Sequence, residues 1–284
     1  MKKSIVSIIA MGLVMVSMLA LSSCRHVKIS EGLAYSVDGE ECTITGIGDC
    51  TDTDLVIPKK IDGYRVTAIT DSAFANNTVI KSAVVSSGIE HIGENAFAGC
   101  TSLESVYLSG SIDEIGTGAF ADCRSLISAT FENGIHVIGD SAFDNCAALN
   151  SIHIPSSVVR IGKTAFAGCV SLENVDFEKG VTEIGDGAFM SCGSMKKLDM
   201  PKSVESVGAN AFKDCKLLEE VMIPRGISKI GAGAFDGCTA LEKVRFEREY
   251  DWTAGGVDVE ELQDASKAAE LLTVTHADKI WERK

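Results

Sequence analysis

Apolar residues return at fixed positions every 23 residues along most of the chain. Phenylalanine marks the clearest of these positions, and an alanine precedes every copy. The copies are Phe74, Phe97, Phe120, Phe143, Phe166, Phe189, Phe212 and Phe235. A period of this length is the signature of a solenoid, in which each repeat forms one turn of the column and contacts only its neighbours. We call each such turn a rung.

Other apolar positions keep the same register. A glycine stands four residues before each phenylalanine from Phe97 onward, and a cysteine stands three residues after it. The rung reads Ile-Gly-x-x-Ala-Phe-x-x-Cys-x-x-Leu-x-x-Val-x-Leu. One rung cannot bury so many apolar groups by itself. Stacked rungs bury each side chain against its copies, which stabilises the fold by about 1.5–3 kcal/mol per large side chain.

The end of each rung predicts a short β-strand, because Val106, Leu108 and their copies alternate with polar residues. We expect these strands to pair in parallel from rung to rung. The segment between the glycine and the cysteine predicts one turn of α- or 3₁₀-helix, which residues such as Asn95 begin and residues such as Gly99 end. The predicted fold class is a right-handed repeat solenoid, mostly β, with short parallel strands and one-turn helices.

The chain divides into four expected segments. Residues 1–23 are predicted to be an export signal, and residues 24–63 an anchor segment with an N-terminal cap. Residues 64–247 hold eight 23-residue repeats. Residues 248–284 are predicted to form a C-terminal cap with a helix from about Asp258 to Leu272, which protects the open edge of the last rung.

The first residues have the pattern of a secretory signal, since Lys2 and Lys3 precede an apolar run from Ile5 to Leu21. The following Ser-Ser-Cys24 resembles the lipobox of bacterial lipoproteins. This resemblance implies that Cys24 carries a diacylglycerol after cleavage, and acyl chains hold a protein on a bilayer by about 0.8 kcal/mol per buried methylene. The alternative is an uncleaved transmembrane helix, for which an apolar run of about 18 residues suffices. A cysteine at this position favours the lipoprotein.

The rung itself resembles the bacterial BspA-type leucine-rich repeat, whose core is Ile-Gly-x-x-Ala-Phe-x-x-Cys-x-x-Leu, over about residues 64–247. The preceding segment from Asp54 to Ile69 also resembles the start of this family's repeat region, with five extra residues after Pro58. The resemblance implies a protein of the bacterial cell surface that attaches to host matrix proteins or to other bacteria. In leucine-rich repeats the strand face is usually the concave recognition surface.

Two outward columns of the predicted strands vary between rungs, so the core does not dictate their identity. We call these columns together the recognition strip. Its first column supplies the candidate ligand-binding residues, which are Tyr107, Thr130, His153, Asp176, Asp199, Met222 and Arg245. Its second column comprises Ser105, Ser128, Ser151, Asn174, Lys197, Glu220 and Lys243. Tyr107, His153 and Met222 are the expected anchors, because aromatic and apolar groups dominate binding hot spots. The competing interpretation is a solvated face without a ligand.

Charge argues against two classes of partner. Residues 24–284 contain 24 Lys and Arg against 40 Asp and Glu, because Lys2 and Lys3 fall within the predicted signal. A net charge near −16 repels nucleic acid and anionic membrane surfaces. We therefore expect no nucleic-acid partner, and contact with a membrane only through the lipid anchor.

The ten cysteines do not predict a disulfide scaffold. Seven of them occupy one column of the repeat, from Cys100 to Cys238, and are expected to form a ladder of buried free thiols. Cys42 and Cys50 stand outside the repeat and flank a segment typical of a hairpin. Their spacing is compatible either with one local disulfide or with two free thiols. No C-x-x-C or mixed Cys/His spacing indicates a metal site.

Motifs of catalysis are absent from the sequence, which lacks G-x-S-x-G, H-E-x-x-H and the phosphate-binding G-x-x-x-x-G-K-[ST]. His91, His136 and His153 fall in different columns and should not converge. Asp176 and Asp199 lie one rung apart and are candidates for a Ca²⁺ site or a hydrolase pair, but two carboxylates alone more often remain solvated. We expect no enzyme activity and no cofactor.

The sequence therefore predicts a lipid-anchored protein of the cell envelope that is exposed at the cell surface and binds like an adhesin. Its expected partners are a host matrix protein, a bacterial surface protein or a glycan. The alternative is a structural scaffold of the envelope that has no external ligand.

Overall fold

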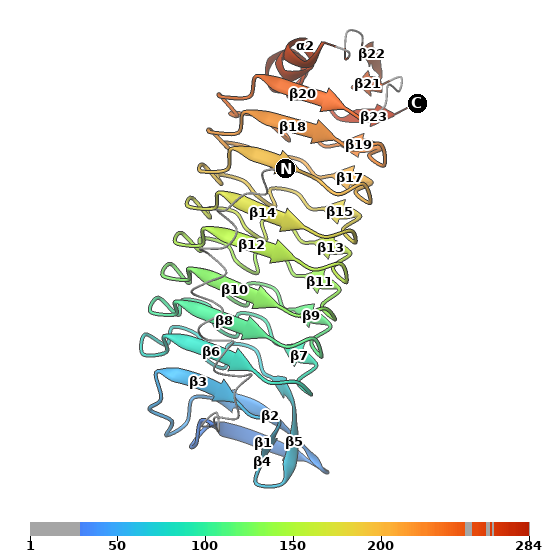
Figure 1. The fold of residues 1–284 in the computed structure, drawn as a ribbon. Helices are drawn as coiled ribbons and strands as arrows, with labels where there is room; N and C mark the ends of the chain where they lie inside the picture. The colour runs from blue at the N-terminus through green and yellow to red at the C-terminus, as the bar shows by residue number, and fades with distance from the viewer. Residues whose placement is uncertain (1–28, 248–251, 260–261, 263, 284) are drawn as a thin grey trace, which may run out of the picture.

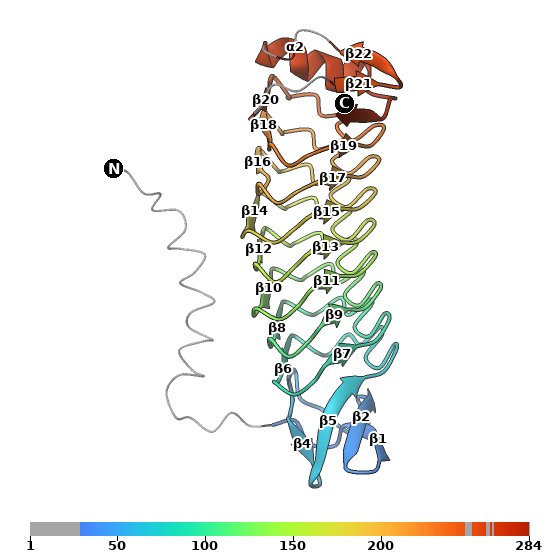
Figure 2. The same ribbon diagram turned by 90° about the vertical axis from the view of Figure 1, so that its right-hand side faces the viewer.

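The computed structural model describes residues 29–247, 252–259, 262 and 264–283. Stacked rungs form one elongated column, with the first described residues at one end and the C-terminal residues at the other (Figure 1). The column is nearly straight when viewed at a right angle (Figure 2). The predicted solenoid is thus confirmed as a mostly β fold with very little helix. Residues 1–23 and Cys24 lie outside the described residues.

One face of the column consists of the long strands, which pair in parallel with each residue beside its copy one rung away. Nine of them occur in the described chain: β3 (Asp54–Ile57), β6 (Ser82–Val85), β8 (Ser105–Leu108), β10 (Ser128–Phe131), β12 (Ser151–Ile154), β14 (Asn174–Phe177), β16 (Lys197–Asp199), β18 (Glu220–Ile223) and β20 (Lys243–Phe246). Their second and fourth residues, such as Val106 and Leu108, face the core and are mostly buried, although Val175, Phe177 and Phe246 are only partly buried. The alternation predicted from the sequence therefore sets which side chains face outward.

The long strands form three hydrogen-bonded blocks, β3–β6–β8–β10, β12–β14 and β16–β18–β20. Elsewhere the residue after a strand donates its N–H to the rung before, as Glu178 does to the Ile154 carbonyl at 2.9 Å. Pro155 and Pro201 follow β12 and β16, where the breaks occur, and proline has no N–H to donate. Pro224 lacks this N–H too, yet β18 still pairs with β16. The missing bond alone is therefore insufficient to break the ladder.

A second face consists of two-residue strands that continue one sheet along the column. These strands are β7 (His91–Ile92), β9 (Glu114–Ile115), β11 (Val137–Ile138), β13 (Arg160–Ile161), β15 (Glu183–Ile184), β17 (Ser206–Val207) and β19 (Lys229–Ile230). In each, the second residue is buried and belongs to the Ile-Gly step of the repeat. We call this the short-strand face.

The third side of each rung, around the Ala-Phe pair, corrects one expectation. No helix forms there; the segment is a run of turns. Gly118 and Asp122 have φ of +62° and +58°, and left-handed residues two before and two after the phenylalanine interrupt a helical path. Successive backbone N–H groups donate alternately within the rung and to the next rung. The Ala119 N–H donates to Gly116 O at 3.1 Å and closes a turn, whereas the Phe120 N–H donates to Ala142 O of the next rung at 2.8 Å.

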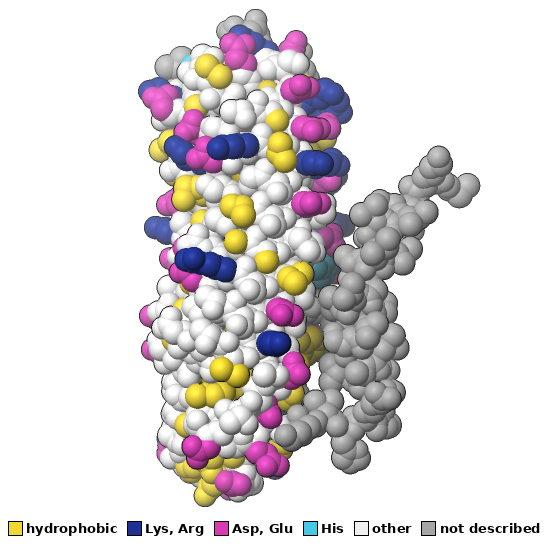
Figure 3. Space-filling view, turned by 90° about the vertical axis from the view of Figure 1, so that its left-hand side faces the viewer, with side chains coloured by type: hydrophobic (Ala, Val, Ile, Leu, Met, Phe, Trp, Pro, Cys, Tyr) yellow, Lys and Arg dark blue, Asp and Glu magenta, His cyan; other side chains and the backbone are white. Residues whose placement is uncertain are grey.

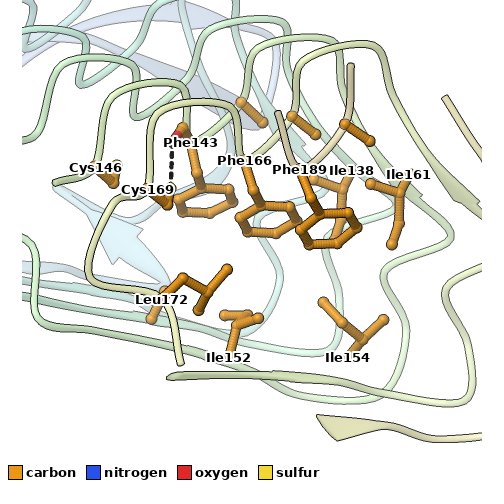
Figure 4. Close-up of a cluster of buried hydrophobic side chains, with 14 of the residues drawn as sticks. Ile138, Phe143, Cys146, Ile152, Ile154, Ile161, Phe166, Cys169, Leu172 and Phe189 are labelled. Atoms are coloured by element: carbon orange, nitrogen blue, oxygen red, sulfur yellow. Dashed lines mark hydrogen bonds between the residues drawn. The ribbon is translucent and has the colours of Figure 1, made fainter. Parts of the chain in front are cut away.

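The phenylalanines form a continuous stack inside the column. Consecutive rings lie 4.8 to 5.4 Å apart between centroids, with interplanar angles of at most 19°. All eight are buried. Figure 4 shows three of them, Phe143, Phe166 and Phe189, between the isoleucines of the short strands and those of the long strands. The core predicted from the repeat is therefore present.

The cysteine column lies beside this stack, and all seven thiols are buried and free. Each Sγ donates to the phenylalanine carbonyl of the rung before, at 3.1 to 3.3 Å. Figure 4 marks the bond from Cys169 to Phe143. Burial raises the pKa of the Cys169 thiol to about 12 and raises the pKa of Cys146 and Cys192 as well. The thiols are thus small core groups that each satisfy one carbonyl.

The N-terminal cap differs from expectation around its two cysteines. Cys42 and Cys50 are both free and buried. The hairpin does not lie between them; it joins β1 (Ala34–Asp38) to β2 (Glu41–Gly46), and Cys42 lies within β2. Strand β2 then pairs with β5 (Tyr64–Ile69), whose hairpin with β4 (Lys60–Ile61) accommodates the five extra residues. The sheet of the short strands begins at this cap.

The edge of β3 is partly covered by Ser30, which lies near the start of the described chain. Ser30 donates its N–H to Val56 O at 3.1 Å, and its hydroxyl accepts the Val56 N–H at 3.0 Å. Ser30 is buried despite its polarity, because both its backbone and its side chain are paired. Ser30 thus makes the hydrogen bonds to Val56 that a neighbouring strand would otherwise make.

The C-terminal cap closes the other end. Strand β23 (Trp281–Arg283) pairs antiparallel with β19 and with β21 (Trp252–Ala254), which in turn pairs with β22 (Val257–Val259). The expected helix is shorter: α2 spans Ala265–Glu270 and continues as a π-helix, η1, over Leu271–Thr275. It begins there because Asp264 accepts the N–H groups of two residues of its first turn.

Candidate recognition surface

The structure places all seven candidate ligand-binding residues on the outer side of the long strands. The ladders bring them into three groups: Tyr107 beside Thr130, His153 beside Asp176, and Asp199 beside Met222 beside Arg245. Neighbours within a group are separated by the strand spacing of about 4.8 Å. The strip is therefore a rigid row on a flat face, not a cupped one (Figure 2).

Tyr107 is held in place by a neighbouring rung. Its hydroxyl donates to the Glu132 carboxylate, and the other oxygen of Glu132 accepts the Gly110 N–H at 3.0 Å. Burial and the Glu132 carboxylate raise the pKa of Tyr107 to about 12. The hydroxyl is thus occupied, while the ring remains half-exposed on the surface.

His153 lies between two carboxylates of the next rung. Its Nδ1 is 2.9 Å from Asp176 Oδ2, and its Nε2 is 3.5 Å from Glu178 Oε1. Glu178 also accepts the Ser156 N–H at 2.9 Å. The other two histidines of the repeat lie on or next to the short-strand face, His91 in β7 and His136 before β11. The three imidazoles are therefore spread over two faces.

The C-terminal part of the strip is a set of ion pairs. Lys197 Nζ lies 2.6 Å from Asp199 Oδ2, which raises the pKa of Lys197. Arg245 Nε lies 3.5 Å from Glu220 Oε1. Met222 is 36% exposed. Asp176 and Asp199 each have a basic neighbour, and the described residues contain no group of three or more His, Cys, Asp or Glu placed to hold a metal ion.

Three glutamates beside the strip were not anticipated from the sequence. Glu132, Glu178 and Glu247 each follow a strand, and each accepts a backbone N–H of the preceding rung at 2.9 to 3.2 Å. Glu247 also pairs with Lys202 at 2.5 Å, which lowers its pKa. The signal that could have found them is the Phe-Glu pair, which ends the strand in these three rungs.

A shallow groove of about 470 Å³ lies on the short-strand face, between β13 and the C-terminal cap. Its floor is the glycine column, from Gly185 to Gly231, together with two alanines and Ile280. Its rim contains ion pairs, for example Arg160 with Asp140 at 3.6 Å. No feature of the repeat pattern predicted this groove. In the described chain, no helix is both long enough and apolar enough to cross a bilayer.

Comparison with known proteins agrees with this architecture. The profile of the BspA type leucine rich repeat region matches residues 49–160 and 136–251. The leucine-rich repeat protein TpLRR of T. pallidum has a similar crystal structure, with a TM-score of 0.59 and 28% identity over 75% of this chain and 90% of its own. A leucine-rich repeat protein of Bacteroides ovatus superposes with a TM-score of 0.55 and 23% identity over 78% of this chain and 71% of its own. No curated protein matches by sequence. The chain belongs to the BspA-type leucine-rich repeat family.

Proposed function

We propose that this protein is a lipid-anchored binding protein of the bacterial cell surface, which engages protein or glycan ligands through the recognition strip. One observation carries the proposal: two columns of residues that vary between rungs lie together on one outer face, with their backbones held in parallel ladders. A preorganised surface binds without the entropic cost of ordering itself. The fold is typical of binding proteins, and family membership supports this role.

The position of the N-terminal cap supports the anchored arrangement. Four residues lie between Cys24 and Ile29, where the described chain begins, and the five Cα–Cα steps from Cys24 to Ile29 reach at most about 18 Å. Acyl chains on Cys24 would thus hold the β3 end of the column near the bilayer. The strip starts at this same end and continues along the column to β20.

The test is an array of matrix proteins and glycans probed with residues 25–284. We expect one or more ligands to bind, and binding to be lost when Tyr107, His153 and Met222 are all replaced by alanine. Lys163→Ala on the short-strand face is the matched control and should bind as the unmodified protein does. Absence of any bound ligand, or equal binding by both variants, would contradict the proposal.

Protease treatment of intact cells separates this function from that of an internal envelope scaffold. An adhesin-like protein must be cleaved from outside, whereas a scaffold beneath the surface is protected. Protection in intact cells together with cleavage after lysis would favour the scaffold.

A further inference from the structure

The N-terminal part of the recognition strip has a different chemistry from the rest. The outward residues of β8 and β10 in the strip, and those of β6 one rung before it, are all uncharged. We call them the hydroxyl patch: Ser82, Val84, Ser105, Tyr107, Ser128 and Thr130. In contrast, β14 to β20 present charged residues in every rung, such as Asp176 and Arg245. The strip thus divides into a neutral part and an ion-paired part.

This neutrality is local, because the surrounding chain is acidic. Between Arg65 and Arg160 the sequence contains two cations, Lys81 and Arg124. Figure 3 shows the same asymmetry on the adjacent face, where Lys and Arg side chains gather toward the C-terminal end. A patch without charge on such a chain suits an uncharged partner, since a polyanion is repelled by the protein as a whole.

Three of the four serine and threonine hydroxyls of the patch are available for hydrogen bonding, whereas Ser82 Oγ donates to Asp54 Oδ1 at 2.7 Å. In the part of the chain that the structure describes, the side chains of Ser105, Ser128 and Thr130 make no hydrogen bond. The ladder places Ser105 directly beside Ser128, and Tyr107 beside Thr130. Each hydroxyl can donate one hydrogen bond and accept two. The patch therefore offers rows of free hydroxyls at the rung spacing of about 4.8 Å.

Tyr107 adds one fixed aromatic ring among these hydroxyls. Its hydroxyl is bonded to Glu132, which is itself bonded to Gly110, so the side chain loses little freedom when a ligand binds. Val84 lies beside it in the neighbouring rung. A ring with an adjacent apolar side chain presents a flat surface for the C–H face of a sugar.

We infer that the hydroxyl patch binds a neutral polysaccharide, a conclusion that rests on the proposed binding function of the strip. A sugar chain combines apolar C–H faces with many hydroxyls, which matches one aromatic ring surrounded by serine and threonine. Protein hot spots are instead enriched in Trp, Tyr and Arg and poor in Ser, Thr and Val. Four of the six patch residues are Ser or Thr.

The experiment measures retention of residues 25–284 on immobilised neutral glucan, mannan and xylan, on heparin, and on matrix proteins. We expect retention by at least one neutral polysaccharide. Tyr107→Ala should weaken it about tenfold, the upper range for one lost aromatic contact. Thr130→Asp should weaken it similarly by placing a charge in the patch. The fold tolerates this change, since Asp176 and Asp199 occupy the same column.

Thr117→Asp is the matched control, because Asp140 and Asp186 occupy its column outside the strip, and its binding should be unchanged. Thermal unfolding of each variant verifies folding. Neutral-polysaccharide binding that survives both patch variants would overturn the inference. Binding to heparin or matrix proteins alone, abolished by the triple strip variant, would overturn it while leaving the proposed function intact. Retention on no surface would contradict both.

Discussion

At the scale of single residues, the glycine before each Ala-Phe pair is required by the backbone of the neighbouring rung. A Cβ built on Gly116 would lie 2.4 Å from Ile92 O and 2.7 Å from Gly93 O. Real Cβ atoms do not approach backbone oxygens so closely. The glycine column therefore records how closely the rungs stack, and not a need for unusual backbone angles.

Gly116→Ala should destabilise the protein by about 3 kcal/mol, the upper part of the usual range for single substitutions. Gly193→Ala is the matched control, because its added Cβ has no atom within 4 Å and its φ is not left-handed. Urea unfolding of both variants measures the difference in free energy. Equal stability of the two would show that the rungs can separate without cost.

The buried cysteines make stability depend on pH. Burial raises the thiol pKa of Cys146, Cys169 and Cys192, so the unfolded chain releases these protons at lower pH than the folded chain does. The contribution of each buried thiol to the free energy of unfolding is fully present below the thiol pKa of the unfolded chain, about 8.5. Above that pH the contribution falls by up to about 1.4 kcal/mol per pH unit for each such thiol. For Cys169 the decline continues to about pH 12.

Urea unfolding at pH 8, 9 and 10 checks this dependence. The free energy of unfolding should decline less between pH 9 and 10 for Cys169→Ala than for the unmodified protein, whatever the absolute stability of the variant.

Thiol titration of the unfolded, unreduced protein should find at least seven free thiols. A count of zero would contradict the ladder of free thiols.

At the scale of elements, the sequence predicted the long strands and the core because both repeat. Phe120 has a copy in every rung, and the positions of Val106 and Leu108 are apolar in every rung, so one period predicts that these positions face the core. The turn around Ala-Phe was mistaken for a helix because Asn and Gly favour helix ends and left-handed turns alike. Only the bonds to the next rung, such as Phe120 N–H to Ala142 O, distinguish the two.

Elements without a repeat were less predictable. Strands β21 to β23 depend on pairing between residues far apart in sequence, which no periodicity indicates. On the recognition strip, the alternation predicted which residues face outward. It could not predict that Glu132 holds Tyr107 or that His153 lies between two carboxylates, since these contacts join different rungs through flexible side chains.

The C-terminal cap offers a matched pair of tryptophans. Trp281 donates its Nε1–H to His276 O at 3.2 Å, whereas the buried Nε1 of Trp252 has no acceptor among the described residues. Trp281→Phe should therefore cost about 1 kcal/mol more than Trp252→Phe, the value of one hydrogen bond. Thermal unfolding compares the two variants directly. A larger loss for Trp252→Phe would contradict the assignment of the bond.

At the scale of the whole molecule, the proposed lipid anchor on Cys24 would determine where in the cell the protein resides. Cys24→Ser removes the only nucleophile that the proposed lipidation uses. The variant should move from the membrane fraction to the soluble fraction, or accumulate as uncleaved precursor, and should lose incorporation of labelled palmitate. Unchanged membrane association without label would indicate that the apolar run from Ile5 to Leu21 is retained as the anchor.

The identical register of every ladder has a consequence for how such a column changes its length. Each rung bonds to its neighbour through residues exactly one period apart, as Ser105 to Ser128 and Ile115 to Ile138. Duplication or loss of a complete 23-residue unit therefore preserves the internal files of side chains. Insertion or deletion of any other number of residues would place a phenylalanine beside a residue that is not its copy in the neighbouring rung. The column therefore lengthens by whole repeats, and each added repeat moves the C-terminal cap about 4.8 Å farther from the N-terminal cap.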